Sequence, residues 1–89
     1  MKMQLRTPDA IVLERNDVLS FSGTLQDERR ITILPGHAPL LAVLQKGNVT
    51  IKNEKEEEEI LIGESILKFR DDQISLYVLD EPESKEERP

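Results

Sequence analysis

The sequence has no cysteine and only one histidine, His37. Without thiols, the chain has no disulfide framework, no thiolate metal site and no thiol nucleophile, and an intracellular protein fits this absence best. A zinc site needs three or four ligands, and no second histidine or cysteine is present to join His37. We therefore expect no bound metal.

Motifs for nucleotide binding and catalysis are also missing. The four glycines are too scattered to form Gly-x-x-x-x-Gly-Lys-Ser/Thr or Gly-x-Gly-x-x-Gly, and there is no Gly-x-Ser-x-Gly elbow. Adjacent acids such as Asp71-Asp72 are typical of solvated turns, because a general acid and base require unequal, partly buried environments. We expect no catalytic residue, no cofactor and no enzymatic activity, with a small hydrolase using His37 as the weakest alternative.

Long apolar runs and an excess of positive charge are absent too. The first residues lack the apolar stretch of a secretory signal, and no run approaches the roughly 20 apolar residues of a membrane span. The formal charge of -6, from 18 acidic and 12 basic residues, disfavours nucleic acid and anionic lipid surfaces. We expect a protein partner, with no nucleic acid and no direct membrane insertion.

What the sequence does contain is a succession of short strand patterns. Val18 to Leu25 alternates apolar with small polar residues, the clearest such signal, and Gly23 within it indicates a bulge or a close backbone approach. Seven polar residues at 53–59 lack an apolar stripe and predict a solvated hairpin loop rather than a helix. Further strands are expected at 3–6, 10–13, 31–34, 40–44, 49–52, 60–62, 66–69 and 74–79.

Turn residues recur roughly every 8 to 12 positions, which is typical of an all-β sandwich or barrel. Aromatic residues make up only 3%, so the core must be built mainly from Leu, Ile and Val. We expect one domain at 1–79. The charged segment at 80–89 has no apolar residue and predicts a disordered acidic tail.

The stretch from Leu34 to Leu44 organises this pattern. Pro35 and Pro39 bracket a glycine and His37, between strand-like residues and an apolar run, so a fixed turn is expected to join two buried segments. His37 is interpreted as a turn residue whose ring bonds the backbone or a partner. Because proline removes backbone freedom, presenting this turn to a partner costs little ordering entropy.

The nine residues from Ile33 to Leu41, Ile-Leu-Pro-Gly-His-Ala-Pro-Leu-Leu, resemble the signature of the epsilon subunit of F-type ATP synthases, called delta in mitochondria. Leu5 to Asp9 is similar to the opening strand and Thr-Pro turn of that family. Leu44 to Lys52 is similar to its Leu-x-x-Gly-x-x-x-Ile-x segment, and Ile60 to Val78 has its closing rhythm of short strands.

The resemblance implies a flattened sandwich of about ten short strands in two sheets. It also implies a non-catalytic rotor subunit of the central stalk, which couples the gamma subunit to the membrane-embedded ring of c subunits. Such a complex lies at the cytoplasmic face of the inner (plasma) membrane, where the subunit is peripheral. By position in the family, the gamma contact is expected at Asp9, His37, Ala38, Pro39, Leu40 and Leu41, and the ring contact at Asp27, Glu28, Arg29 and Arg30.

The chain departs from the family in three places. A Gly-rich loop before the signature is replaced by the charged stretch at 25–33, and a Ser-Gly-Gly turn is replaced by Ile62-Gly63-Glu64-Ser65. Many members add a C-terminal helical hairpin that binds ATP in some bacteria, and we expect this chain to lack it, as a naturally short or truncated form, and to bind no ATP. The alternative function is a freestanding all-β adaptor domain for protein–protein interaction.

Overall fold

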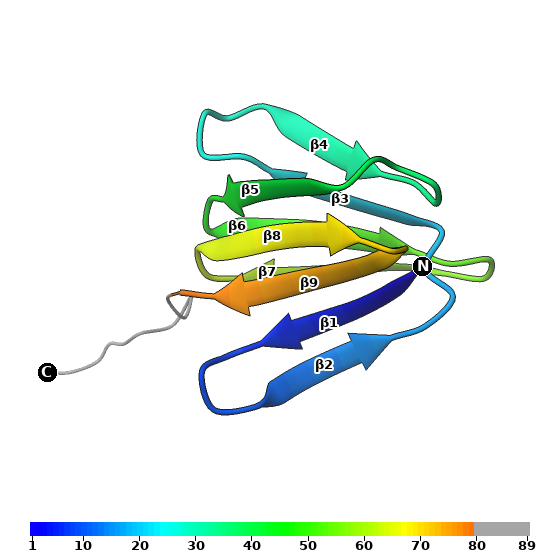
Figure 1. The fold of residues 1–89 in the computed structure, drawn as a ribbon, viewed down its shortest axis with the longest axis horizontal. Coiled ribbons are helices and arrows are strands. Elements are labelled where there is room, and N and C mark those ends of the chain that lie inside the picture. The colour runs from blue at the N-terminus through cyan, green and yellow to red at the C-terminus, as the bar shows by residue number, and fades with distance from the viewer. Residues whose placement is uncertain (80–89) are drawn as a thin grey trace, which may run out of the picture.

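The structure, a computed structural model, describes residues 1–79, in which short strands follow one another along the chain (Figure 1). The predicted tail at 80–89 lies outside the described residues. Within residues 1–79 no helix is long and apolar enough to cross a membrane. The described strands are β1 (Lys2–Arg6), β2 (Ile11–Arg15), β3 (Ser20–Thr24), β4 (Arg30–Ile33), β5 (Leu40–Leu44), β6 (Gly47–Lys52), β7 (Glu57–Ile62), β8 (Ser65–Arg70) and β9 (Gln73–Val78).

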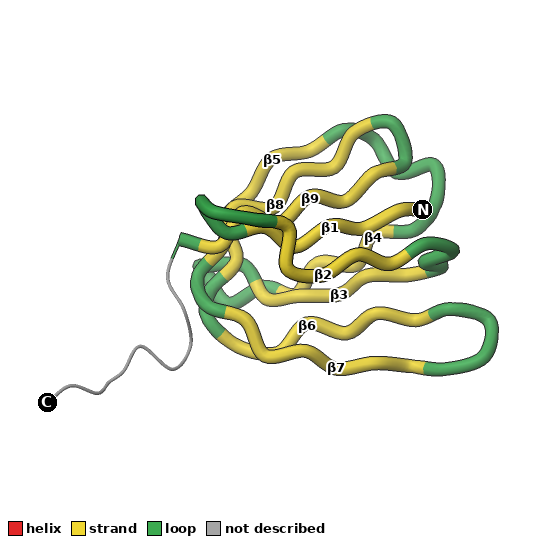
Figure 2. The backbone as a smooth tube through the Cα atoms, turned by 90° about the horizontal axis from the view of Figure 1, so that it is seen from below, coloured by secondary structure: helices red, strands yellow, loops and turns green. Residues whose placement is uncertain are grey.

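The strands form two sheets that lie face to face (Figure 2). One sheet has five strands in the order β2-β1-β9-β8-β5, and the other has four in the order β4-β3-β6-β7. Neighbouring strands are antiparallel except for β1 and β9, which are parallel. The predicted all-β sandwich of two sheets is therefore confirmed, with nine strands among the described residues.

The core lies between the two sheets and follows the alternation of side chains along each strand. Phe21 on β3 and Phe69 on β8 are its only two phenylalanines, and both are fully buried. Branched aliphatic residues and one methionine supply the rest, as the low aromatic content predicts. The other buried hydrophobic residues are Met3, Leu5, Val18, Ile33, Leu44, Val49, Ile51, Ile62, Leu67, Ile74 and Leu76.

One long side of the sandwich is closed by the backbone. Leu25, just after β3, forms an isolated antiparallel bridge with Leu44 at the end of β5. On either side of that bridge, the Gln26 N–H donates to the Val43 carbonyl at 3.2 Å, and the Gln45 N–H donates to the Thr24 carbonyl at 2.9 Å. These bonds join the edge of the five-stranded sheet to the four-stranded sheet.

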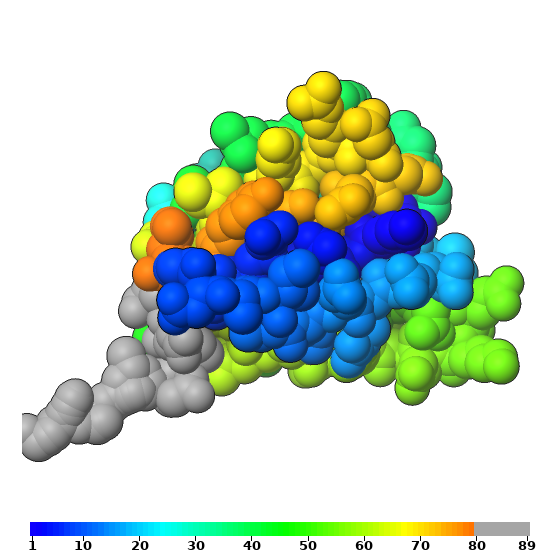
Figure 3. Space-filling view, turned by 60° about the horizontal axis from the view of Figure 1, so that its bottom comes forward, coloured from blue at the N-terminus to red at the C-terminus, as the bar shows by residue number. Residues whose placement is uncertain are grey.

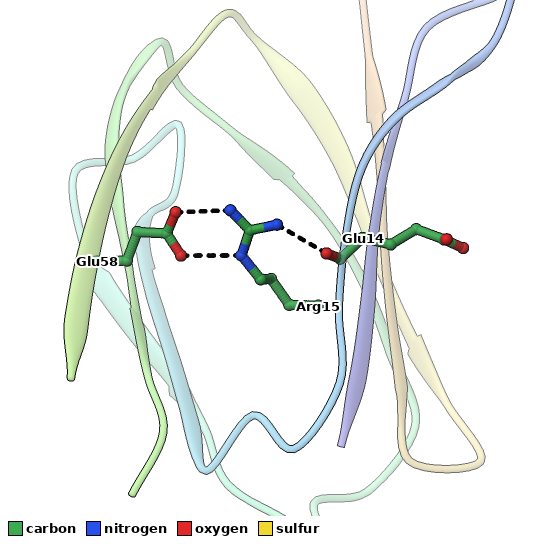
Figure 4. Close-up of polar contacts among 3 residues, drawn as sticks. All are labelled: Glu14, Arg15 and Glu58. Carbon is green, nitrogen blue, oxygen red and sulfur yellow. Dashed lines mark hydrogen bonds and ion pairs between the residues drawn. The ribbon is translucent and has the colours of Figure 1, made fainter. Parts of the chain in front are cut away.

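The other long side is joined by an ion pair between two edge strands (Figure 4). Arg15 at the end of β2 donates through Nε and Nη2 to the two carboxylate oxygens of Glu58 on β7, at 3.0 and 2.8 Å. Its Nη1 donates to the Glu14 carbonyl at 2.8 Å. The guanidinium therefore links the two sheets and also donates a hydrogen bond to a backbone carbonyl of the edge strand β2.

The expectation of a solvated loop at 53–59 is wrong in its second half, because Glu57, Glu58 and Glu59 belong to β7. They pair with Lys52, Ile51 and Thr50 of β6, which supply backbone hydrogen-bond partners that composition does not reveal. The turn itself is limited to the residues between β6 and β7.

The Arg15 guanidinium holds the pKa of Glu58 below its ordinary value of 4.5, because it donates hydrogen bonds to the carboxylate and carries the opposite charge. A lowered pKa stabilises the fold above pH 4.5, and this contribution is lost as pH falls through the lower folded value. Glu58→Gln should therefore lower Tm relative to the natural chain at pH 7, and this Tm gap should narrow as pH falls below 4.5.

The matched control for that comparison is Glu59→Gln, on the same strand but with its side chain exposed. Thermal unfolding of the three proteins across the pH range measures the difference. A Tm gap for Glu58→Gln that stays constant from pH 7 to about pH 3 would contradict this role of the carboxylate.

Two other expectations need correction. Gly23 pairs regularly with Ile31 in the β3–β4 ladder and does not form a bulge. The register shift in the structure lies instead in the β1–β2 ladder, between Leu5 and Arg6. The apolar run of β5 is only partly buried, since Leu44 is inside and Leu41 is 72% exposed. The close approach at Gly23 is made by the side chains of Leu44 on the opposite sheet and Val49 on its own sheet.

Candidate functional site

The proline-bracketed loop joins β4 to β5 through a tight turn. The His37 N–H donates to the Leu34 carbonyl at 3.0 Å, which closes a β-turn with Pro35 and Gly36 at its centre. Gly36 has φ of +86°, as the third position of a type II turn requires, and proline suits the position before it. The Gly36 N–H also donates to Asp72 Oδ1 at 3.2 Å, so the loop is fastened to the β8–β9 turn.

The His37 ring packs edge-on against the buried ring of Phe69, with centroids 5.9 Å apart and planes at 87°. Its Nδ1 lies 2.7 Å from the Ala38 carbonyl, which can only accept, so Nδ1 carries the proton. The ring thus covers the end of the core while remaining exposed. This geometry gives His37 a structural position and leaves the loop surface open to a partner.

The charged loop between β3 and β4 is a compact hairpin turn. The Glu28 N–H donates to the Leu25 carbonyl at 2.9 Å, and the Leu25 N–H donates to the Arg29 carbonyl at 2.8 Å. Glu28 has φ of +73°, the left-handed conformation in which many three-residue hairpin loops place glycine. A non-glycine residue therefore occupies a glycine-type position in the stretch that replaces a Gly-rich loop.

Asp27 organises the tip of this loop. Its carboxylate accepts from the Arg29 N–H at 3.2 Å and from Arg29 Nε at 2.7 Å. The backbone bond, followed by the guanidinium bond, lowers the pKa of Asp27. Arg30 Nη1 donates to Thr24 Oγ1 at 2.9 Å. The loop therefore presents a mixed, exposed charged surface held in one conformation by its own side chains.

The structure places the predicted ring contact, in the β3–β4 loop, at the end of the sandwich opposite the β4–β5 loop, which holds His37 (Figure 1). Strand register puts Leu40 beside Phe69, Ile74 and Met3, at the end where the chain begins. The β1–β2 turn, which holds Asp9, and the β3–β4 loop lie at the opposite end. Asp9 is therefore brought to the end that carries the Asp27–Arg30 loop, and not to His37.

The signature also leads into residues that sequence reasoning did not select. Leu41, an expected gamma contact, points away from the core, and the unselected Val43 and Tyr77 lie on the same outer face, 36% and 37% exposed. The alternation of β5, in which Leu40, Ala42 and Leu44 face inward, identifies Val43, and the alternation of β9, in which Ile74 and Leu76 face inward, identifies Tyr77. The described residues contain no group of three or more His, Cys, Asp or Glu side chains placed to hold a metal ion.

Comparison with known proteins agrees with this architecture. A family profile described as "ATP synthase, Delta/Epsilon chain, beta-sandwich domain" matches residues 1–80. The ATP synthase epsilon chain of Moorella thermoacetica is 30% identical over 88 residues, which cover 98% of this chain and 63% of that protein. The epsilon chain of Alkalihalophilus pseudofirmus is 29% identical over 76 residues, 85% of this chain and 56% of that protein. The chain thus spans about 56 to 63% of the length of these curated relatives.

Solved structures share the fold at low identity. A chain from the Tetrahymena thermophila mitochondrial ATP synthase central stalk/c-ring structure superposes with a TM-score of 0.68 at 18% identity, covering 89% of this chain and 63% of that one. A chain from the Euglena gracilis mitochondrial ATP synthase OSCP/F1/c-ring structure gives 0.76 at 15% identity, covering 88% and 49%. At these identities the likeness establishes the fold.

Proposed function

The chain belongs to the ATP synthase delta/epsilon β-sandwich family, and we propose that it is a non-catalytic rotor subunit that couples the gamma subunit to the c-subunit ring. The family match over residues 1–80 carries this proposal. Two curated relatives bear the name ATP synthase epsilon chain, and the two structural relatives come from complexes whose descriptions include the c-ring. As part of that complex the subunit would be peripheral, at the cytoplasmic face of the membrane.

The fold suits a part that transmits torque. Its two sheets share a continuous apolar core, and backbone bonds at the Leu25–Leu44 bridge and an ion pair at Arg15–Glu58 tie their two long sides. Sheets fixed in this way resist sliding, because any displacement breaks packing contacts and hydrogen bonds together. No step of this role requires a catalytic group.

The predicted contacts can be assigned to parts of this body. The Asp27–Arg30 loop is an exposed, internally braced tip, and we assign it to the polar loops of the ring. The gamma contact, at Asp9 and at His37 to Leu41, extends over both ends of the sandwich. A single gamma subunit that touches both regions must therefore lie along the five-stranded sheet.

Reversing both Arg29 and Arg30 to Glu is expected to weaken attachment to purified c-ring about tenfold, because two exposed attractions of up to about 1 kcal/mol each become repulsions. Binding to purified gamma should be unchanged. Lys55→Glu, in the β6–β7 turn at the other end, is the control and should alter neither. Equal loss of both bindings by the double variant would refute the division of surfaces.

The rotor assignment itself is tested by mixing the chain with purified gamma. A stoichiometric complex on size-exclusion chromatography is expected, and its absence would favour a freestanding adaptor domain.

A further inference from the structure

The β8–β9 turn holds two aspartates in a backbone conformation that favours glycine. Asp71 has φ of +53° and Asp72 has φ of +58°, and these two residues lie between the paired Arg70 and Gln73. A two-residue hairpin loop in which both φ values are positive is typical of a type I′ turn, whose common sequences are Asn-Gly and Asp-Gly. Asp71 therefore fits its position, whereas Asp72 occupies the position that glycine usually takes.

Asp72 makes one contact with its main chain and another with its side chain. Its carbonyl accepts a hydrogen bond from the Lys2 N–H at 3.1 Å, at the start of β1. Its Oδ1 accepts a hydrogen bond from the Gly36 N–H at 3.2 Å, in the loop between β4 and β5. Glycine at position 72 would keep the first bond and lose the second. The bond to Gly36 is therefore the contact that offsets the backbone strain of a non-glycine residue in this turn.

The proline-bracketed loop that Asp72 reaches, residues 34–39, is exposed along its length. The backbone hydrogen bond that closes its β-turn lies within the loop, so this bond shapes the turn without fixing where the loop lies on the sandwich. Two contacts with the β8–β9 hairpin fix that position: the His37 ring packs on Phe69, and the Gly36 N–H donates to Asp72. The second contact is a hydrogen bond, which is directional and so restricts the orientation of the turn.

The β8–β9 hairpin is a firm base for such a contact. Phe69 and Ile74, the pair next to the turn, are 1% and 0% exposed. Figure 3 shows β8 and β9 side by side with β1 on the outer face of the five-stranded sheet. Their turn lies at the end of the sandwich where β4 leads into the proline-bracketed loop (Figure 1). A carboxylate on this turn therefore has a fixed position relative to the core.

We propose that Asp72 is a positioning residue: through the Gly36 N–H, its carboxylate holds the proline-bracketed loop in the conformation that the gamma subunit binds. This inference rests on the proposed function, which assigns His37 to Leu41 to the gamma contact. A loop that is ordered before association loses less conformational entropy on binding, so it binds more tightly for the same contacts. The Asp72 carboxylate acts through the loop and needs no contact of its own with gamma.

Amide hydrogen exchange of the full chain, followed by NMR, tests the intramolecular half of this proposal without a partner. Asp72→Gly should make the Gly36 amide exchange at least about fivefold faster, because its acceptor is gone. Asp72→Asn keeps an acceptor oxygen at the same place, so the exchange rate should stay within about twofold of that of the natural chain. The matched control, Asp71→Gly, removes a carboxylate from the same turn and also places glycine at a positive φ, and it should leave Gly36 exchange unchanged.

Binding of the same variants to purified gamma tests the other half. Asp72→Gly should raise Kd about fivefold, because gamma must then order the loop itself. Asp72→Asn and Asp71→Gly should leave Kd within about twofold of the natural value, because both keep the loop fastened. Circular dichroism and Tm for every variant establish that it is folded before exchange or binding is compared.

Unchanged Gly36 exchange in Asp72→Gly would refute the positioning role, whatever the binding result. If Asp72→Asn keeps Gly36 protected but weakens gamma binding as much as Asp72→Gly does, the carboxylate contacts gamma directly and the positioning role is wrong. If the natural chain forms no complex with gamma, the proposed function fails. That failure is distinguishable from the first, because the exchange measurement needs no partner.

Discussion

Replacing Phe69 with alanine is expected to lower the free energy of unfolding by about 3 to 5 kcal/mol. The ring is 1% exposed and is one of only two phenylalanines in the core. No other large ring lies in the core to refill the space, apart from Phe21 on the opposite sheet. A domain of this length has a total stability of about 4 to 12 kcal/mol, so this one change removes a large part of it.

Urea denaturation of the natural chain and the Phe69→Ala variant measures the loss. His37→Ala is the matched control, because it removes the edge-on ring contact, worth about 0.5 to 1.5 kcal/mol, while leaving the buried ring in place. A loss below about 1 kcal/mol for Phe69→Ala would mean that the core collapses to fill the cavity, which would contradict a closely packed core.

The strands were predictable where burial alternates within a short segment. Apolar and polar residues alternate from Val18 to Leu25, and the structure contains β3 there. Phe21 faces the core and Ser22 faces away from it. The turn at Pro35 and Gly36 could equally be predicted from the sequence, since proline fixes its own φ and glycine accepts the positive φ that the next position requires. Signals of this kind depend only on neighbours in the chain.

The errors come from partners that are distant in the sequence. Glu57 to Glu59 have no strand signal of their own, and their pairing with β6 together with the Arg15 contact, 43 residues away, makes them part of a sheet. The parallel pairing of β1 with β9 likewise joins two strands that are far apart in the sequence, and neither strand carries a local signal that names its partner. Composition cannot supply this information, because it lies in the pairing.

The predicted contact residues depend on the pairing of distant strands as well. Position in the family selected Asp9 and His37 for one surface, whereas the topology separates them by the length of the sandwich. The sheet between them contributes Val43, Ile66 and Tyr77, which come from three strands and form a row only through register. A surface assembled from several strands becomes visible once the sheet order is known.

Replacing Gly23 with valine is the second change for which we expect a large effect, a loss of about 1 to 3 kcal/mol. Gly23 is buried on β3 and does not have a positive φ, so the backbone would accept any residue. A Cβ at this position would lie 3.3 Å from both Leu44 Cδ1 and Val49 Cγ1, which is already tight. The two further methyl groups of valine extend into side chains that are 0% and 2% exposed and have no room to move.

The measurement is chemical denaturation of Gly23→Val beside Ser22→Val, which adds the same branched side chain to the outer face of the same strand. Ser22→Val should change the stability by no more than about 0.5 kcal/mol. Adding Val49→Ala to Gly23→Val removes one of the two clashing groups, so the double variant should be less destabilised than the sum of the singles, by about 0.5 to 3 kcal/mol. Simple additivity would contradict a steric origin. Leu44 also forms the bridge that joins the two sheets, so crowding at Gly23 pushes on the contact that closes this side of the sandwich.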